Sequence, residues 1–113
     1  MNTKMSKLTT LTLLTAILFA VGCTTIQVNK TAKGIYEPTL PASVEIKAIV
    51  PADRPFEEIG LIHGDIYGNN PSSAYNDMRI KAAAVGGDAI VISNQMMLGG
   101  RTILNGAVIK YKD

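Results

Sequence analysis

The sequence predicts a small α+β domain in which one helix covers a four-stranded sheet, in the order β-β-α-β-β. The first observation is a loop, a helix and a buried strand in immediate succession over residues 69–93. The second is the alternation of apolar residues over residues 44–50, which is typical of a strand with one buried face. The third is the pair of glycines at positions 99 and 100, between two apolar runs, which indicates a hairpin.

The helix is expected to begin at Asn70 or Ser72, whose side chains can cap its first turn. Pro71 suits that turn because a backbone N–H at this position has no partner within the helix, so proline loses nothing by lacking one. Gly86 and Gly87 can adopt the left-handed conformation that ends a helix. One apolar stripe at helical spacing faces a partner surface and consists of Tyr75, Met78, Ala82 and Val85.

Four strands surround this helix in the sequence. The first begins near Ser43, where the folded domain over residues 43–113 is expected to start. The second covers residues 59–66, and its Gly60 and Gly64 indicate a bulge or a close approach. The third is the β-branched run at residues 89–92, and the fourth covers residues 103–111.

The first 22 residues resemble a bacterial signal peptide. Lys4 and Lys7 precede an apolar stretch over residues 8–21. That stretch is shorter than the roughly 20 residues that a helix needs to cross a bilayer. An uncleaved membrane anchor is the alternative reading of the same segment.

Cys23 ends a sequence that resembles the bacterial lipobox, Ala20-Val21-Gly22-Cys23, in which small residues precede a cysteine that is lipidated and becomes the new N-terminus. Ala20 departs from the Leu that is commonest at that place. Cys23 is the chain's single cysteine, so it has no disulfide partner within the chain. The alternative is a small apolar residue without a role, but its place after Gly22 favours lipidation. Two or three acyl chains on one residue suffice for stable anchoring.

Cleavage before Cys23 would leave 91 residues, and residues 23–42 are expected to form the lipidated N-terminus and a flexible tether. An aspartate directly after Cys23 would resemble an inner-membrane retention signal, but this chain has Thr24 there. An outer-membrane location is therefore expected if the cell has two membranes. Lys4 and Lys7 account for the net charge of +2, so the remaining chain is neutral. The net charge is therefore no argument for nucleic-acid binding, and the chain has no run of Lys and Arg with interleaved aromatic residues, so no nucleic-acid partner is expected.

Residues 57–111 resemble a group of small bacterial envelope proteins, the RcsF and YbjQ-type (heavy-metal-binding) domains. The resemblance implies the fold and an envelope location more than a role. RcsF-type domains are disulfide-bonded, and this chain has no cysteine beyond Cys23. The matching positions are Ala74, Met78, Arg79, Lys81, Ala82, Ala83, Gly86, Gly87, Asp88 and Ala89.

Few residues point to chemistry. His63, the single histidine, lies two residues before Asp65 in a predicted strand, so both face one side and could begin a metal site. A half-exposed strand histidine is the alternative. Ser72 and Ser73 are better explained as helix-capping residues than as nucleophiles, because no nucleophile-elbow motif surrounds them.

An acidic group at Asp53, Glu57 and Glu58 could do acid–base work, but adjacent exposed carboxylates usually form a solvated rim. The pairs Gly86-Gly87 and Gly99-Gly100 lack the lysine and spacing of a phosphate-binding loop. We therefore expect no catalytic residues, no bound metal and no cofactor, and we do not expect an enzyme.

The segment over residues 95–101 carries Met96, Met97 and Leu98 beside the Gly-Gly turn. These side chains either pack in the hairpin or form an exposed patch that contacts an envelope protein partner. The expected function is a non-catalytic binding, sensor or structural module on an outer-membrane lipoprotein, anchored by lipid on Cys23. The alternative is a metal- or small-ligand-binding module of the YbjQ-like type, with an oligomeric form as one option.

Overall fold

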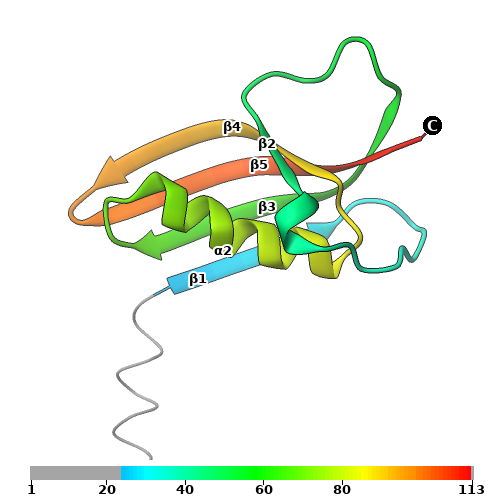
Figure 1. Cartoon of the computed structure of the whole chain (residues 1–113). Helices are drawn as coiled ribbons and strands as arrows, with labels where there is room; N and C mark the ends of the chain where they lie inside the picture. The colour runs from blue at the N-terminus through cyan, green and yellow to red at the C-terminus, as the bar shows by residue number, and fades with distance from the viewer. Residues whose placement is uncertain (1–23, 113) are drawn as a thin grey trace, which may run out of the picture.

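The computed structural model describes residues 24–112, which form a mixed five-stranded sheet with one α-helix packed on one face (Figure 1). The predicted α+β class with a single covering helix is therefore confirmed, and the number of strands is corrected from four to five. The strands run in the order β1-β3-β5-β4-β2 across the sheet. The elements are β1 (Thr24–Lys30), the 3-10 helix η1 (Pro41–Ser43), β2 (Glu45–Lys47), β3 (Phe56–Tyr67), α2 (Pro71–Ala84), β4 (Ala89–Leu98) and β5 (Arg101–Tyr111).

The added strand, β1, lies in the segment expected to be a flexible tether. It pairs antiparallel with β3 from Thr24 opposite Ile66 to Lys30 opposite Gly60. Ile26 and Val28 point toward the helix side and pack against the core. An alternation of only two apolar residues is too short to identify a strand from sequence. The segment forms a strand because the long outer edge of β3 supplies its hydrogen-bonding partners.

Residues 31–40, here called the crossing segment, also belong to the domain. They run from the end of β1 across the C-terminal end of α2 and lead into η1 (Figure 1). The backbone N–H of Thr39 donates to the carbonyl of Ala83 (2.9 Å), and its hydroxyl donates to the carbonyl of Gly87 (2.5 Å). The expected tether over residues 24–42 is thus held to the sheet by β1 and to the helix by the crossing segment.

Helix α2 begins as the sequence predicts. The Asn70 side chain accepts hydrogen bonds from the backbone N–H groups of Ser72 (3.1 Å) and Ser73 (3.4 Å), and Pro71 is the first helical residue. The two serines therefore contribute their backbone to the capped first turn. After the helix, Gly86 has a φ of +89°, which confirms the predicted left-handed stop.

The core lies between α2 and the sheet. The helix inserts one large side chain, Met78, among small ones, and β3 makes room for it at Gly64, where a Cβ would lie 2.7 Å from the Met78 sulfur. The predicted irregularity at Gly60 is present as a register shift between Glu58 and Gly60. Fully buried core side chains include Ile59, Ile62, Ala74, Met78, Ala82, Ile90, Leu104 and Val108.

The β4–β5 hairpin is longer than expected, because β4 continues from the predicted run at residues 89–92 to Leu98. Gly99 (φ +59°) and Gly100 (φ +76°) form its turn, as predicted. Strand β2 pairs with β4 only over Glu45–Lys47, opposite Ala89–Val91, so the distal half of the hairpin extends beyond it.

Candidate functional site

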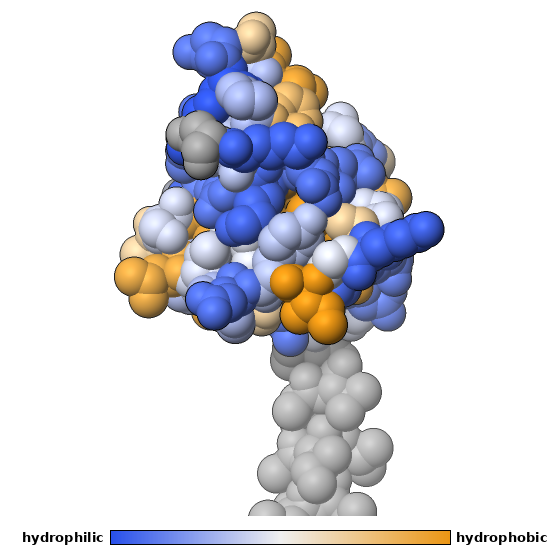
Figure 2. All heavy atoms as spheres, turned by 90° about the vertical axis from the view of Figure 1, so that its right-hand side faces the viewer, coloured by the Kyte–Doolittle hydropathy of each residue, from blue (hydrophilic) through white to orange (hydrophobic). Residues whose placement is uncertain are grey.

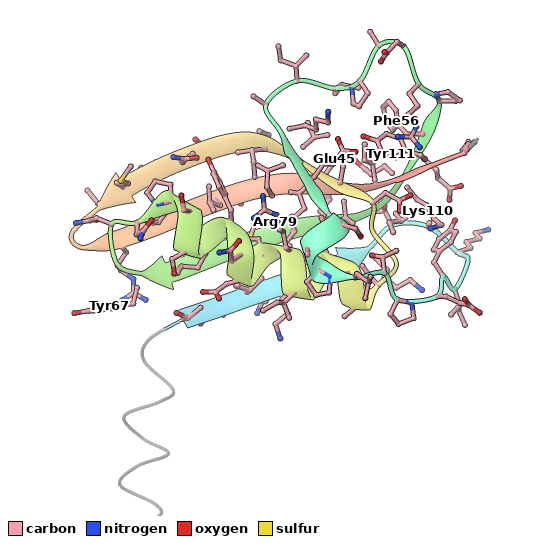
Figure 3. The ribbon with its side chains drawn as sticks, viewed as in Figure 1. Glu45, Phe56, Tyr67, Arg79, Lys110 and Tyr111 are labelled. Carbon is pink, nitrogen blue, oxygen red and sulfur yellow. The ribbon has the colours of Figure 1, made fainter. Side chains whose placement is uncertain are left out.

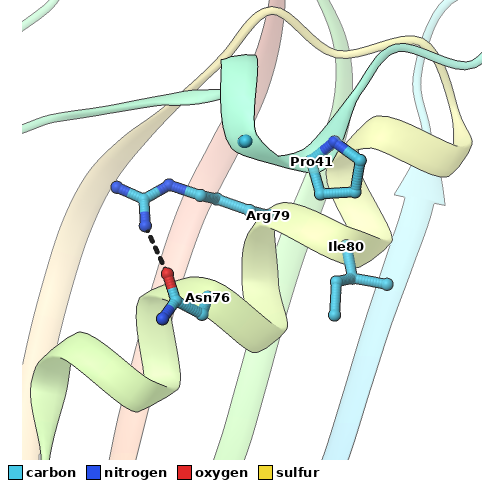
Figure 4. A pocket seen from close by; sticks show the side chains of 5 residues that line it. Pro41, Asn76, Arg79 and Ile80 are labelled. Carbon is cyan, nitrogen blue, oxygen red and sulfur yellow. Dashed lines mark hydrogen bonds between the residues drawn. The ribbon is translucent and has the colours of Figure 1, made fainter.

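A shallow hollow of about 480 Å³ lies between η1 and α2 and is lined by Pro41, Ala42, Asn76, Arg79 and Ile80 (Figure 4). The Arg79 Nε donates to the carbonyl of Val44 (3.0 Å), and its Nη1 donates to the Asn76 Oδ1 (2.6 Å). The guanidinium therefore ties η1 to the helix. This explains Arg79, one of the positions matching the envelope-protein pattern, as a packing residue.

A group of charged and polar side chains surrounds the end of β5 that carries Tyr111 (Figure 3). The Lys47 ammonium lies 2.9 Å from the Glu45 carboxylate. This hydrogen bond lowers the pKa of Glu45 and raises the pKa of Lys47. Burial raises the pKa of Tyr111, whose ring lies beneath the Arg54 guanidinium at 3.6 Å. All three shifts favour the form already present at neutral pH, so none of these groups is tuned for proton transfer there.

His63 and Asp65 do lie on one face of β3, as the strand spacing predicts, but each has its own partner. The Nδ1 of His63 is 2.7 Å from the Asn105 Oδ1, and the Asp65 Oδ1 accepts from the Arg101 Nε at 2.7 Å. Within residues 24–112, no group of three or more His, Cys, Asp or Glu side chains is placed to hold a metal ion. The pair therefore does not extend to a metal centre in this part of the chain.

The acidic residues Glu57 and Glu58 hold the crossing segment against β3. Glu57 accepts a hydrogen bond from the Tyr36 hydroxyl, and Glu58 accepts one from the Thr31 hydroxyl (3.3 Å). The bond to Glu57 raises the pKa of Tyr36. Sequence reasoning did not identify this bond, because Glu57 lies 21 residues from Tyr36 in the chain and no local pattern links them.

The end of the sheet at the β4–β5 hairpin is apolar and exposed. Met96, Met97 and Leu98 are 45%, 51% and 63% exposed, which decides against the alternative that they are packed inside the hairpin. Tyr67, which sequence reasoning did not single out, ends β3 beside them and is 70% exposed. We call the side chains of Tyr67, Met96, Met97 and Leu98 the apolar tip.

Comparison with known proteins extends this description of the fold. No protein-family model and no curated protein matches the chain. Among solved structures, it is similar to the Francisella virulence factor FvfA, seen in an orthorhombic crystal form. The TM-score is 0.60 at 15% sequence identity, over 75% of this chain and 96% of that one. At this identity the likeness shows the fold alone.

The described residues include two kinds of surface group, namely charged side chains that pair with one another and exposed apolar side chains. The charged clusters near Tyr111 and on β3 consist of side chains that bind one another. The apolar tip instead leaves large side chains exposed to solvent at one end of the molecule. Met97 points to one face of the sheet and Met96 and Leu98 to the other, because side chains alternate along β4. No helix within residues 24–112 is long and apolar enough to cross a membrane.

Proposed function

We propose that this chain is a bacterial envelope lipoprotein whose domain works by presenting a binding surface and has no catalytic role. The observation that carries the proposal is the lipobox-like Ala20–Cys23, which ends a short apolar segment and directly precedes β1. The resemblance of residues 57–111 to the RcsF and YbjQ-type envelope domains supports the same location. Thr24 after the lipidated cysteine favours the outer membrane of a cell with two membranes.

The surface that we assign to this role is the apolar tip. Methionine side chains adapt to irregular partners, and Met96 and Met97 lie beside the Gly-Gly turn of the hairpin. The ion pairs and hydrogen bonds of His63, Asp65 and Glu45 support a structural role for the residues that could otherwise have done chemistry. An envelope protein that binds Met96, Met97 and Leu98 is one candidate partner.

Lipidation is tested by mass spectrometry of the protein extracted from membranes. We expect residues 1–22 to be absent and Cys23 to carry acyl mass. The matched variant Cys23→Ser should remain unacylated and should leave the membrane fraction, because the acyl chains supply the anchor. A Cys23→Ser variant that still loses residues 1–22 and stays membrane-bound to the same extent would overturn the proposal.

A metal- or small-ligand-binding module is the second candidate, and the shared face of His63 and Asp65 is the observation that favours it. Its support is weaker, because both side chains already have partners within the domain. A ligand that binds only the native state raises the thermal midpoint of unfolding as its concentration rises. A midpoint that does not respond to zinc or nickel therefore argues against this candidate.

A further inference from the structure

We infer that the apolar tip rests on the lipid bilayer to which Cys23 is anchored, so that the partner of this surface is the membrane itself. The inference rests on the lipidation proposed above and names what the exposed surface touches. Its basis is the register of the sheet, which places the start of β1 and the end of the hairpin at the same level.

The register forms a continuous row across four strands. Thr24 of β1 is opposite Ile66 of β3, Ile66 is opposite Thr102 of β5, and Thr102 is opposite Met97 of β4. Neighbouring strands lie about 4.8 Å apart, so three steps place Met97 only about 14 Å from Thr24. In Figure 1, β1 accordingly begins at the end of the sheet where the hairpin turns.

The next row toward that end consists of Tyr67, Arg101 and Leu98, which are opposite one another in register. Cys23 is bonded to Thr24, and consecutive Cα atoms are about 3.8 Å apart. Thr24, to which Cys23 is bonded, is opposite Ile66, the residue before Tyr67, and the strand that carries Leu98 lies three strand spacings away across the sheet. Acyl chains on Cys23 bring this end of the domain to the membrane surface.

Because β1 is paired, the connection between Cys23 and the domain is much shorter than a flexible tether would be. A flexible segment over residues 24–42 could have spanned roughly 60 Å when extended at about 3.3 Å per residue. Seven residues of β1 are instead paired with β3, beginning at Thr24 itself. The domain is therefore held at the bilayer surface, with its hairpin end closest to the anchor.

The chemistry of this end suits a lipid surface. Tyr67 and Leu98 are 70% and 63% exposed, and tyrosine is enriched where proteins meet the headgroup region of a bilayer. Figure 3 shows Tyr67 at the outermost part of this end, away from the polar group around Tyr111. The Arg101 guanidinium is paired with the Asp65 carboxylate at 2.7 Å. We therefore expect the contact between the tip and the membrane to be mainly apolar and to depend little on anionic lipid.

The opposite end of the molecule has a different surface. Figure 2 views the molecule from that end, whose surface is mainly hydrophilic with separate hydrophobic patches. It includes Ile35 of the crossing segment, which is 92% exposed. Ile35 follows the far end of β1, where Lys30 is opposite Gly60, six residues along the strand from Thr24. It is a matched reference position, because it is also apolar and exposed but lies far from the anchor.

The chain contains no tryptophan, so a single introduced tryptophan reports on one position. We would reconstitute the lipidated Leu98→Trp and Ile35→Trp proteins in phosphatidylcholine vesicles and add phosphatidylcholine with brominated acyl chains, which quenches fluorescence on contact. We expect blue-shifted emission and several-fold stronger quenching for Leu98→Trp than for Ile35→Trp. Raising the salt concentration should leave the difference unchanged.

Equal, weak quenching at both positions in acylated, vesicle-bound protein would overturn the inference and leave the proposed lipidation standing. Emission of Leu98→Trp that shifts only when membrane proteins are added would also overturn it, in favour of a protein partner. Absence of acyl mass on Cys23 would instead defeat the proposed function and, with it, this inference. The unfolding midpoint of each variant, compared with the unmodified chain, verifies that both are folded.

Discussion

Gly86 and Gly87 follow helix α2, and the fold needs them for different reasons. Gly86 has a φ of +89°, and a Cβ there would lie 2.5 Å from the Tyr36 Cβ and 2.8 Å from the Glu37 carbonyl oxygen. A Cβ on Gly87 would lie 2.5 Å from Val108 Cγ1. One glycine lets the crossing segment pass over the helix end, and the other lets the chain approach β5.

We predict that Gly86→Ala lowers the free energy of unfolding by more than about 2 kcal/mol. Left-handed backbone costs about 1 kcal/mol with a side chain, and overpacking adds roughly 1–3 kcal/mol. Gly99→Ala is the control, because Gly99 also has a positive φ (+59°) but a Cβ there would have no other atom within 4 Å. Urea unfolding measures both. Equal losses in the two variants would show that the contact with Tyr36 contributes nothing.

Tyr36 shows how a single side chain holds a long connection in place. Its hydroxyl donates to Glu57, and its ring lies 5.7 Å from the Lys110 ammonium. Lys110 also donates to the carbonyl of Gly86 at 3.3 Å. Four segments of the chain therefore meet around one aromatic residue, namely the crossing segment, β3, the loop after α2 and β5.

At the scale of elements, β1 changes the character of the N-terminal part of the domain. It covers the outer edge of β3, which would otherwise present unpaired N–H and C=O groups. It also brings Ile26 and Val28 to the side of the sheet that faces α2. The strand therefore contributes both hydrogen bonds and apolar burial to the domain.

We predict that Ile26→Ala lowers the free energy of unfolding by about 1–2 kcal/mol, because a partly buried apolar side chain is lost from the core face. The neighbouring Gln27→Ala is the matched control, since Gln27 is exposed and such changes usually stay within about 0.5 kcal/mol. Thermal or urea unfolding of the domain would compare them. Losses near zero for both variants would mean that residues 24–30 act as a tether after all.

At the scale of the whole molecule, the sheet is covered by α2 on one face, and the proposed lipid anchor would hold it from one corner. The start of β1, the end of β3 and the hairpin share that end of the sheet, because strand pairing aligns them. The residues that cross the C-terminal end of α2 lie at the other end. A lipid on Cys23 would therefore set the orientation of the domain as well as its distance from the bilayer.

This orientation predicts the effect of a longer connection. Insertion of ten Gly and Ser residues between Cys23 and Thr24 adds a coil with an end-to-end distance of about 17 Å. We expect the quenching of Leu98→Trp by brominated lipid to fall toward the level of Ile35→Trp, because the corner is no longer held at the surface. Acylation, measured by mass, should not change. Quenching as strong as without the insertion would show that the anchor does not position the tip.

Some features follow from the sequence alone because they depend on neighbouring residues. The start of α2 at Asn70 and Pro71, its end at Gly86 and the hairpin turn at Gly99 are set by local backbone preferences, and all three were predicted. The same holds for the shared face of His63 and Asp65, since side chains alternate along any strand. Strands β3, β4 and β5 are longer than expected, because pairing extends strands beyond their most apolar residues. The first predicted strand, over residues 44–50, is instead shorter, because β2 pairs with β4 only over Glu45–Lys47.

Other features were decided only by the tertiary structure, because they join residues far apart in the chain. TTIQVNK carries too little apolar pattern to identify β1, and it becomes a strand because β3 offers an unpaired edge. The bond from Tyr36 to Glu57 likewise depends on how the crossing segment is placed. The row from Thr24 to Met97 arises from three successive strand pairings, each set by long-range register. The sequence by itself thus determined the helix, the turn and the residues of the hairpin, and only the packed sheet placed that hairpin at the end where β1 begins.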